Sequence, residues 1–502
     1  MLRAVFLLIL CGAADAAIIR GIVVEHLTGR PLARTVVVAD PVSGGGGAKS
    51  VRTDLSGGFV FEGLSGGAFI VSAARKGFAP TQYGQKQWKS AGLPVILGED
   101  QAAQIEIRMH RMGSITGHIM DENDVGLPDH EVVAYRDTRP PMLVTRVTAD
   151  ERGVYRIPLL DPGRYLLRTV ARTFEEGGYV PTFFRDVFPV EQARAVDVSL
   201  DEETTDITIH PSPGHLFKVA GIASVPRMGT GQPPVTLTLV SDMGKETAQA
   251  DDRGHFQFNP QAPGRYELNL TSTYGRDPYG GYVPFELDRD QTDLRISGIS
   301  YPQVRVALQD VRGADVDWRA LQVIARRKEL SGPGARQNID LSHSLGQLAP
   351  GRWEFALQAN AAWYPTEFLS QGQPSGSRAE GWNEAMVVAG GGTVNLKFTL
   401  TSPPGAVHGV VTFSSQSAAA AMVFLEPMDL EPAHRISEVR SVRTDAQGRY
   451  HFTGLPPGNY RLLGTFEYQS ATSVDMDAAR ALAIKIEEGR DLQQDLELYV
   501  AR

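Results

Sequence analysis

The chain of 502 residues has a single cysteine, Cys11, which lies in an apolar stretch at the N-terminus. If that stretch is removed, the remaining chain has no thiol, which excludes disulfide bonds, a thiolate nucleophile and cysteine metal ligands. Positive charge is also scarce, because 49 Lys and Arg are outnumbered by 58 Asp and Glu, for a net charge of −9. This balance favours neither nucleic acid nor an anionic membrane surface as a partner.

Long apolar runs are absent outside the N-terminus, so we predict no membrane span. The N-terminal MLRAVFLLILCGAADAA has one basic residue, a short apolar run and an A-x-A pattern. It predicts a secretory signal over residues 1–16, cleaved near Ala16. The alternatives are a core strand and lipidation of Cys11, although Leu10 is larger than the residue that usually precedes a lipidated cysteine. We therefore expect a secreted, periplasmic or cell-surface protein.

Catalytic motifs are missing as well. The sequence contains no H-E-x-x-H and no G-x-S-x-G, and its 11 histidines are spread along the chain. Two weak metal alternatives remain, His210 with His215 in HPSPGH and a calcium loop in DENDVG at 121–126, but solvated histidines and a simple polar turn explain both. We predict no enzyme, no cofactor and no metal ligand.

The sequence does contain a repeated motif, Asp-x-x-Gly-x-aromatic followed by Pro/Gly-Gly-x-aromatic. In four copies an aspartate stands thirteen residues before the second glycine, at Asp54, Asp150, Asp251 and Asp445. A worn copy ends in LAPGRWEFAL and has Asn338 at the aspartate position. The five anchors are 96, 101, 87 and 107 residues apart, a period that is typical of a small β-sandwich domain.

The repeated motif predicts a hairpin followed by a turn into a third strand. Asp initiates a tight turn by accepting hydrogen bonds from the backbone, and the following glycine closes it. Alternating apolar residues such as Tyr155 and Ile157 then indicate a strand with one buried face, and Pro-Gly starts the next turn. With the flanking segments, each repeat holds about seven short strands. Helix is sparse, and DMDAARAL near 475 is the best candidate.

The fold class is therefore predicted as all-β, with five tandem antiparallel β-sandwich domains after the signal at 1–16. We name them unit 1 to unit 5, and the expected boundaries are 17–112, 113–211, 212–301, 302–402 (a degenerate copy) and 403–502.

In the motifs IRGIVV, TGRPL, TDxxGxY/F and PGxY, the chain resembles the carboxypeptidase regulatory-like domain, a transthyretin-like (prealbumin-like) β-sandwich grouped with carbohydrate-binding-like folds. The resemblance covers units 1, 2, 3 and 5 well and unit 4 only at LAPGRWEF. It implies a fold but no chemistry, because such domains are reused in many secreted and surface bacterial proteins.

Aromatic loops follow the third strand in four of the five units. Exposed rings beside polar groups are what a sugar-binding face needs, whereas buried rings would cover their own sandwich or pack against the next unit. The candidate ligand-binding residues are Tyr83, Trp88, Tyr179, Phe183, Tyr279, Tyr282, Trp363, Tyr364 and Trp382.

Two functional hypotheses follow. The first is a non-enzymatic binding protein that recognises extracellular glycan or a cell-envelope protein through the aromatic loops. The second is a structural spacer or assembly module of the cell envelope, in which the same loops hold neighbouring units together. Exposure of Trp88 and Trp363 distinguishes the two.

Overall fold

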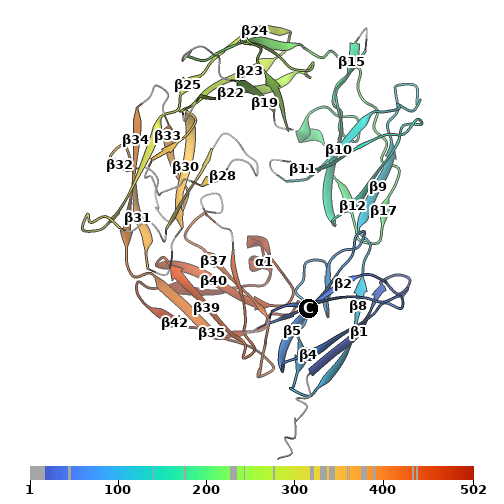
Figure 1. Ribbon diagram of the computed structural model, residues 1–502, viewed down its shortest axis with the longest axis vertical. Coiled ribbons are helices and arrows are strands. Elements are labelled where there is room, and N and C mark those ends of the chain that lie inside the picture. Colours follow the sequence, from blue (N-terminus) through green and yellow to red (C-terminus); the bar gives the residue numbers. More distant parts are fainter. Residues whose placement is uncertain are drawn as a thin grey trace, which may run out of the picture.

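The computed structural model describes residues 17–42, 47–138, 141–174, 177–226, 234–241, 244–274, 277–316, 321–327, 336–338, 345–358, 360, 362–374, 381–387, 392–431, 435–436 and 439–501. The predicted signal and Cys11 lie outside these residues. The turn expected after Asn338 also lies outside the described residues. The described strands fall into five groups along the chain, arranged around a ring (Figure 1). Within the described residues, no helix is both long enough and apolar enough to cross a membrane.

Units 1 and 2 each pair a three-stranded sheet with a larger one. The strands of unit 1 are β1 (Ala17–Glu25), β2 (Val36–Pro41), β3 (Lys49–Arg52), β4 (Gly58–Leu64), β5 (Gly67–Ala74), β6 (Thr81–Gln82), β7 (Val95–Leu97) and β8 (Ala102–Met109). Unit 2 contains β9 (Gly113–His118), β10 (Glu131–Arg136), β11 (Met142–Thr148), β12 (Val154–Leu160), β13 (Gly163–Thr169), β14 (Arg172–Phe174), β15 (Gly177–Tyr179), the 3-10 helix η1 (Val190–Gln192), β16 (Val196–Val198) and β17 (Glu203–Thr204).

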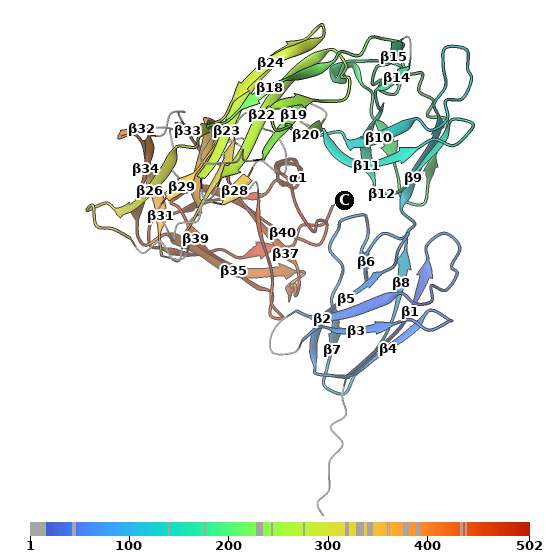
Figure 2. The same ribbon diagram turned by 45° about the horizontal axis from the view of Figure 1, so that its top comes forward.

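Units 3 and 4 repeat the two-sheet plan, and unit 3 has the two longest of the described strands, β22 and β23, with 11 residues each (Figure 2). Unit 3 contains β18 (Val219–Ser224), β19 (Val235–Ser241), β20 (Gly244–Gln249), β21 (His255–Gln257), β22 (Gly264–Tyr274), β23 (Asp277–Leu287), β24 (Gln291–Ser297) and β25 (Ile299–Ser300). Unit 4 contains β26 (Gln303–Asp310), β27 (Gln322–Arg327), β28 (Arg336–Asn338), β29 (Leu345–Gln347), β30 (Gly351–Gln358), β31 (Tyr364–Ser370), β32 (Gln373–Pro374), β33 (Asn383–Val387) and β34 (Thr393–Thr401).

Unit 5 contains the α-helix that the sequence suggests near 475. Its strands and helix are β35 (Gly405–Phe413), β36 (Gln416–Ser417), β37 (Met422–Pro427), β38 (Arg440–Arg443), β39 (Arg449–Leu455), β40 (Gly458–Thr465), α1 (Ser473–Ala478), β41 (Leu482–Ile486), β42 (Asp491–Gln493) and β43 (Leu496–Glu497). A capping box starts α1, because Thr472 accepts from the backbone of Asp475 and the Asp475 carboxylate accepts in return.

The all-β prediction is confirmed, but the sandwiches are not wholly antiparallel. In every unit the first strand pairs in parallel with a late strand: β1 with β8, β9 with β17, β18 with β24, β26 with β34, and β35 with β42 and β43. Parallel neighbours need a long connection, and here the rest of the unit supplies it. Each unit thereby brings its beginning and its end side by side.

The repeated aspartate makes the turn that the sequence predicts. Asp54 Oδ1 accepts from the backbone N–H groups of Ser56 and Gly58, each at 2.8 Å, and Gly57 adopts φ of +75°. Asp150, Asp251 and Asp445 make the same pair of bonds two and four residues on. These bonds stabilise the ionised carboxylate and lower the pKa of Asp150.

The aromatic residue after Pro-Gly fixes the next turn. The hydroxyl groups of Tyr165, Tyr266 and Tyr460 each donate to the carbonyl oxygen four residues earlier, at 2.7–2.8 Å. In the worn copy Trp353 donates its indole N–H to Ala349 O at 2.8 Å, so unit 4 keeps the contact with different chemistry.

A glycine in the first strand has a matching role. Gly21, Gly117, Gly221 and Gly409 each lie directly opposite the aromatic residue of the hairpin, for example Gly117 opposite Tyr155. An added Cβ at Gly117 would lie 1.8 Å from Ile207 O, and one at Gly409 would lie 1.9 Å from Gln494 O. Only glycine lets the aromatic ring and the late strand approach this closely.

Each unit has its own apolar core between its two sheets, centred on residues such as Phe61, Tyr155, Leu268, Phe355 and Phe452. Complete burial of one such side chain contributes roughly 1.5–3 kcal/mol. The units are therefore packed individually, and the contacts between them form a separate layer of structure.

Candidate functional site

Units 1 and 5 contact each other through residues 86–91 and 466–469, and we call this contact the closing seam. The N–H of Ala91 donates to Phe466 O at 2.9 Å, and the N–H of Gln469 donates to Lys89 O at 2.6 Å. The Lys86 ammonium lies 3.2 Å from the Glu467 carboxylate, whose side chain is almost fully buried. These bonds join residues about 380 positions apart and close the ring seen in Figure 1.

The aromatic loop of unit 1 carries the closing seam. Trp88 lies between the residues that bond to unit 5 and is half-buried. The corresponding loops of units 2 and 4 also reach neighbouring units. Tyr179 forms a backbone bridge with Pro213, and Trp382 packs in one apolar cluster with Ile436 of unit 5. The loops therefore contribute to the seams.

Between units 3 and 4 the seam is polar. Arg327 of unit 4 donates to the Asn269 side chain at 3.3 Å, and its guanidinium lies 5.1 Å from the centre of the Tyr282 ring. The Tyr282 hydroxyl donates to Glu267 at 3.1 Å. This aromatic ring thus has a cation on one side and a carboxylate at its edge.

The structure buries five of the nine candidate aromatic residues, with exposed fractions of 8% or less: Tyr179, Phe183, Tyr279, Tyr364 and Trp382. Rings buried to this extent cannot present a flat platform to a sugar, and their packing in cores and seams explains their presence. Four keep some exposure, namely Tyr83, Trp88, Tyr282 and Trp363. Of these, Tyr83 and Trp363 pack against the cores of units 1 and 4.

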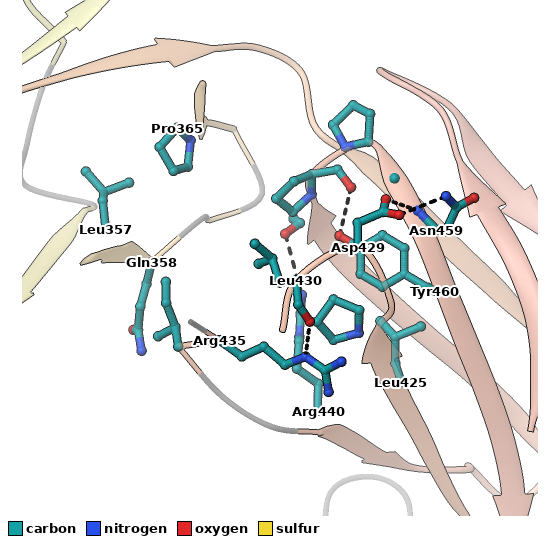
Figure 3. Close-up of a pocket in the computed structure, with 16 residues that line it drawn as sticks. Leu357, Gln358, Pro365, Leu425, Asp429, Leu430, Arg435, Arg440, Asn459 and Tyr460 are labelled. Carbon is teal, nitrogen blue, oxygen red and sulfur yellow. Dashed lines mark hydrogen bonds between the residues drawn. The ribbon is translucent and has the colours of Figure 1, made fainter. Parts of the chain in front are cut away.

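A cavity of about 370 Å³ lies between units 4 and 5 (Figure 3). Leu357, Gln358 and Pro365 of unit 4 form one wall. The opposite wall comes from β37, β40 and the segments beside them, and it is lined by Leu425, Pro427, Asp429, Leu430, Arg435, Ile436, Arg440, Gly454, Pro456, Pro457, Gly458, Asn459 and Tyr460. We call this cavity the unit 4–5 cleft.

The polar groups of the cleft are held in place by neighbouring groups. Asp429 accepts from the backbone N–H and the side-chain amide of Asn459, at 2.7 and 2.9 Å. Arg440 donates to the carbonyl oxygen of Thr453 at 2.9 Å. Arg435 donates to the carbonyl oxygen of Leu430 at 2.8 Å, as Figure 3 shows. The cleft thus offers apolar surface on both walls and preorganised polar groups on the unit 5 wall.

Beneath the cleft lies a buried ionic network. The Glu426 carboxylate is completely buried and accepts from Arg435, from Arg461 at 2.5 Å and from Ser473 at 2.5 Å. Burial alone would raise the pKa of Glu426, but these hydrogen bonds lower it below its usual value. The network connects β37, β40 and the start of α1 to Arg435 in the cleft wall.

The two histidines of HPSPGH have separate partners. His210 lies between two carboxylates, with Nδ1 and Nε2 each 3.1 Å from Asp186 and Asp124, and His215 packs edge-on against Phe217. Burial would lower the pKa of His210, but the hydrogen bonds to both carboxylates raise it above its usual value.

Sequence reasoning missed a different histidine group. His26, His110 and Asp201 converge at the junction of units 1 and 2, with one ligand atom of each within 4.8 Å of the others. His26 follows β1 and His110 follows β8, so only the parallel pairing of these two strands makes them neighbours. The sequence gives no sign of that pairing.

Residues 18–110 match the family model of the carboxypeptidase regulatory-like domain, which confirms the resemblance for unit 1 and indicates no catalytic family. A search of curated proteins found no match.

Among solved structures, the chain is similar to the Bacillus anthracis TIE protein (9% identity, 76% of this chain, 72% of that chain, TM-score 0.18). It is also similar to the minor pilin of Streptococcus agalactiae (13% identity, 43% of this chain, 100% of that chain, TM-score 0.25). A third similar structure is the Bacillus cereus major pilin BcpA (11% identity, 77% of this chain, 98% of that chain, TM-score 0.15). Similarity at these levels carries no information on function.

Proposed function

We propose that the protein is a secreted, non-enzymatic binding scaffold of the cell surface or periplasm, which works as a closed ring of five sandwiches. The observation that carries this proposal is the closing seam, in which Ala91 and Lys89 of unit 1 bond to Phe466 and Gln469 of unit 5. A chain closed in this way fixes the relative position of all five units. Rigid placement of binding surfaces lowers the entropy lost when a partner binds.

The unit 4–5 cleft is the place where the scaffold would hold a partner. It combines an apolar wall containing Leu357 and Pro365 with fixed polar groups such as Asn459, the combination that binding sites usually show. Neighbouring groups already hold these side chains, so binding requires little rearrangement. A protein segment with one apolar side chain and free backbone groups matches both walls.

A second function, recognition of extracellular glycan, is favoured by Tyr282. The residue is 37% exposed, and its ring lies beside Arg327 and Glu267, so a partly exposed aromatic ring stands next to polar partners. Trp88 is the other half-exposed ring at a seam. Partner binding in the cleft and glycan recognition are both compatible with one rigid, closed arrangement of the five units.

Ring closure is tested by disulfide trapping in the protein carrying Lys89→Cys and Gln469→Cys. Cys11, in the predicted signal, is the only native cysteine, so the secreted protein would offer no competing thiol. The backbone hydrogen bond between the two positions places them at disulfide range. We expect rapid intramolecular cross-linking and faster migration on a non-reducing gel. The matched control, Lys89→Cys with Lys245→Cys in unit 3, should not cross-link. Equal behaviour of the two pairs would contradict the closed ring.

Binding is tested separately on isolated bacterial envelope material and a panel of polysaccharides. The scaffold proposal expects saturable binding to the envelope that Leu430→Arg in the cleft abolishes. Glycan recognition expects binding to a polysaccharide that Tyr282→Ala or Trp88→Ala abolishes, while Phe413→Ala, an exposed ring of unit 5, has no effect. No binding to any material would leave the ring a spacer and refute both roles.

A further inference from the structure

Three side chains meet at the junction of units 1 and 2: His26, His110 and Asp201. Their ligand atoms lie within 4.8 Å of one another, and this is the one such group of three in the described part of the chain. His26 and His110 belong to the unit 1 side of the junction, and Asp201 stands in unit 2 just before β17.

We propose that His26, His110 and Asp201 bind a divalent transition-metal ion, with Zn²⁺ the best match, and that the ion links unit 1 to unit 2. Imidazole nitrogen and carboxylate oxygen are ordinary zinc ligands. Three protein ligands leave a fourth position for water or for a group of a partner. The inference is independent of the proposed scaffold function.

The fold brings the two histidines together through backbone register. Strands β1 and β8 run in parallel and end with Glu25 beside Met109, so the next residue of each is a histidine at the same end. The N–H of His26 donates to Met109 O at 2.9 Å, and the two rings are stacked with centroids 3.9 Å apart. Both rings therefore bring a nitrogen atom within reach of one ion.

Asp201 is held at the junction by its own backbone. It adopts φ of +61°, its N–H donates to Arg111 O at 2.9 Å, and its Oδ1 accepts from the Arg111 N–H at 2.6 Å. Its Oδ2 lies 2.5 Å from His110 Nδ1, and the side chain is only 10% exposed. The guanidinium of Arg111 bonds instead to the buried Glu25. The carboxylate is thus fixed toward the histidines.

Metal binding requires only small movements. Tetrahedral zinc with ligands at about 2.0–2.2 Å places the ligand atoms roughly 3.3 Å apart. The His110–Asp201 pair must therefore open slightly from 2.5 Å, and the widest pair must close from no more than 4.8 Å. Rotation of His26, which is exposed, supplies most of this adjustment.

A comparison group in unit 5 provides the control. His408 and His451 both lie near Asp491, at 2.8 and 3.8 Å, but their ring centroids are 6.1 Å apart. Their residues come from three strands of one sheet, so a metal ion there would join no two units. This group is exposed and more open than the junction site.

The test uses the purified protein without a polyhistidine tag, stripped with a chelator and titrated with ZnCl₂ by calorimetry. We expect one saturable junction site. His26→Ala and Asp201→Asn should weaken it by at least the roughly 10–100-fold that changes around metal sites cause. His408→Ala should leave it unchanged. Titration with Co²⁺ should give the visible absorption of a tetrahedral ion, lost in His26→Ala.

Hydrogen exchange supplies a readout of the link between units. Zn²⁺ should slow exchange in the segments 108–112 and 199–203 of the unaltered protein but not of His26→Ala. Because the His26 side chain is exposed, its removal is compatible with normal folding. The result for His26→Ala therefore stands even where Asp201→Asn disturbs the structure of the junction itself. No saturable binding, binding that His26→Ala retains, or binding that only His408→Ala removes would each overturn the proposal.

Discussion

Replacing the first-strand glycine of unit 2 tests how the repeated motif holds a sandwich together. In Gly117→Ala the new methyl group would lie 1.8 Å from Ile207 O and 2.8 Å from the Tyr155 hydroxyl oxygen. The Tyr155 hydroxyl donates to the same carbonyl at 2.7 Å and is deeply buried, which raises the pKa of Tyr155. The variant relieves the clash by moving the segment around Ile207, just after β17, away from β9, which breaks this bond.

The size of the effect follows from two contributions. Overpacking of a filled core costs about 1–3 kcal/mol, and leaving a buried hydrogen-bonding group unpaired costs about 1–3 kcal/mol. Together they predict that unit 2 loses roughly 2–6 kcal/mol of local stability. Gly47→Ala is the control, because an added Cβ there meets nothing within 4 Å. We expect the control to change stability by less than about 0.5 kcal/mol.

The assay is hydrogen exchange followed by mass spectrometry, which reports each unit separately where a single melting curve of five domains would not. Since about 1.4 kcal/mol corresponds to a factor of ten, amides of β9 and β12 should exchange between about 30-fold and 10⁴-fold faster in Gly117→Ala. Protection in units 3 to 5 should be unchanged. A change of less than about fivefold in β9 and β12 would refute the role assigned to this glycine.

Three further outcomes are expected. Tyr155→Phe keeps the aromatic ring but leaves Ile207 O without its buried hydrogen-bond donor. Urea denaturation followed by hydrogen exchange should therefore show that unit 2 is less stable by about 1–3 kcal/mol. Equal stability of the variant and the unaltered protein would contradict the role of this bond. Trp353→Phe removes the indole N–H bond to Ala349 O and should cost unit 4 about 1 kcal/mol in the same measurement. The raised pKa of His210 means that its ion pairs stabilise unit 2 fully below the unfolded pKa of about 6.5 and that this contribution is lost as pH rises through the folded pKa. Exposure limits the effect to about 1 kcal/mol, and Asp186→Asn should reduce the difference in exchange between pH 5.5 and pH 8.

The sequence predicts the interior of each unit well because local chemistry decides it. Asp150, with Gly153 and the alternating Tyr155 and Ile157, determines a turn and a strand without help from distant residues. The helix at α1 is marked in the same way by the Thr472 cap. Even the worn unit 4 keeps the turn contact through Trp353.

What the sequence does not show are relations between residues far apart. The parallel pairing of β1 with β8 has no local signature, so the approach of His26 to His110 could not be predicted. Aromatic composition alone also fails to separate exposed from buried rings. Tyr179 and Trp382 look like a sugar platform in the sequence, but both are buried. The Tyr179 ring lies beside His130 of its own unit, and Trp382 packs with Ile324, Ala356 and Ile436. Packed rings and sugar sites both place aromatic residues beside polar groups, so the sequence does not separate them.

The closing seam also bears on how such a chain can evolve. An open row of repeats tolerates the gain or loss of a copy, since each repeat contacts only its neighbours. Here Phe466 and Gln469 of the last copy bond to the first, so deletion of any internal copy would leave these partners apart unless every remaining junction changed its angle. Variation in loops outside the seams leaves this contact intact, whereas loss of an internal copy does not.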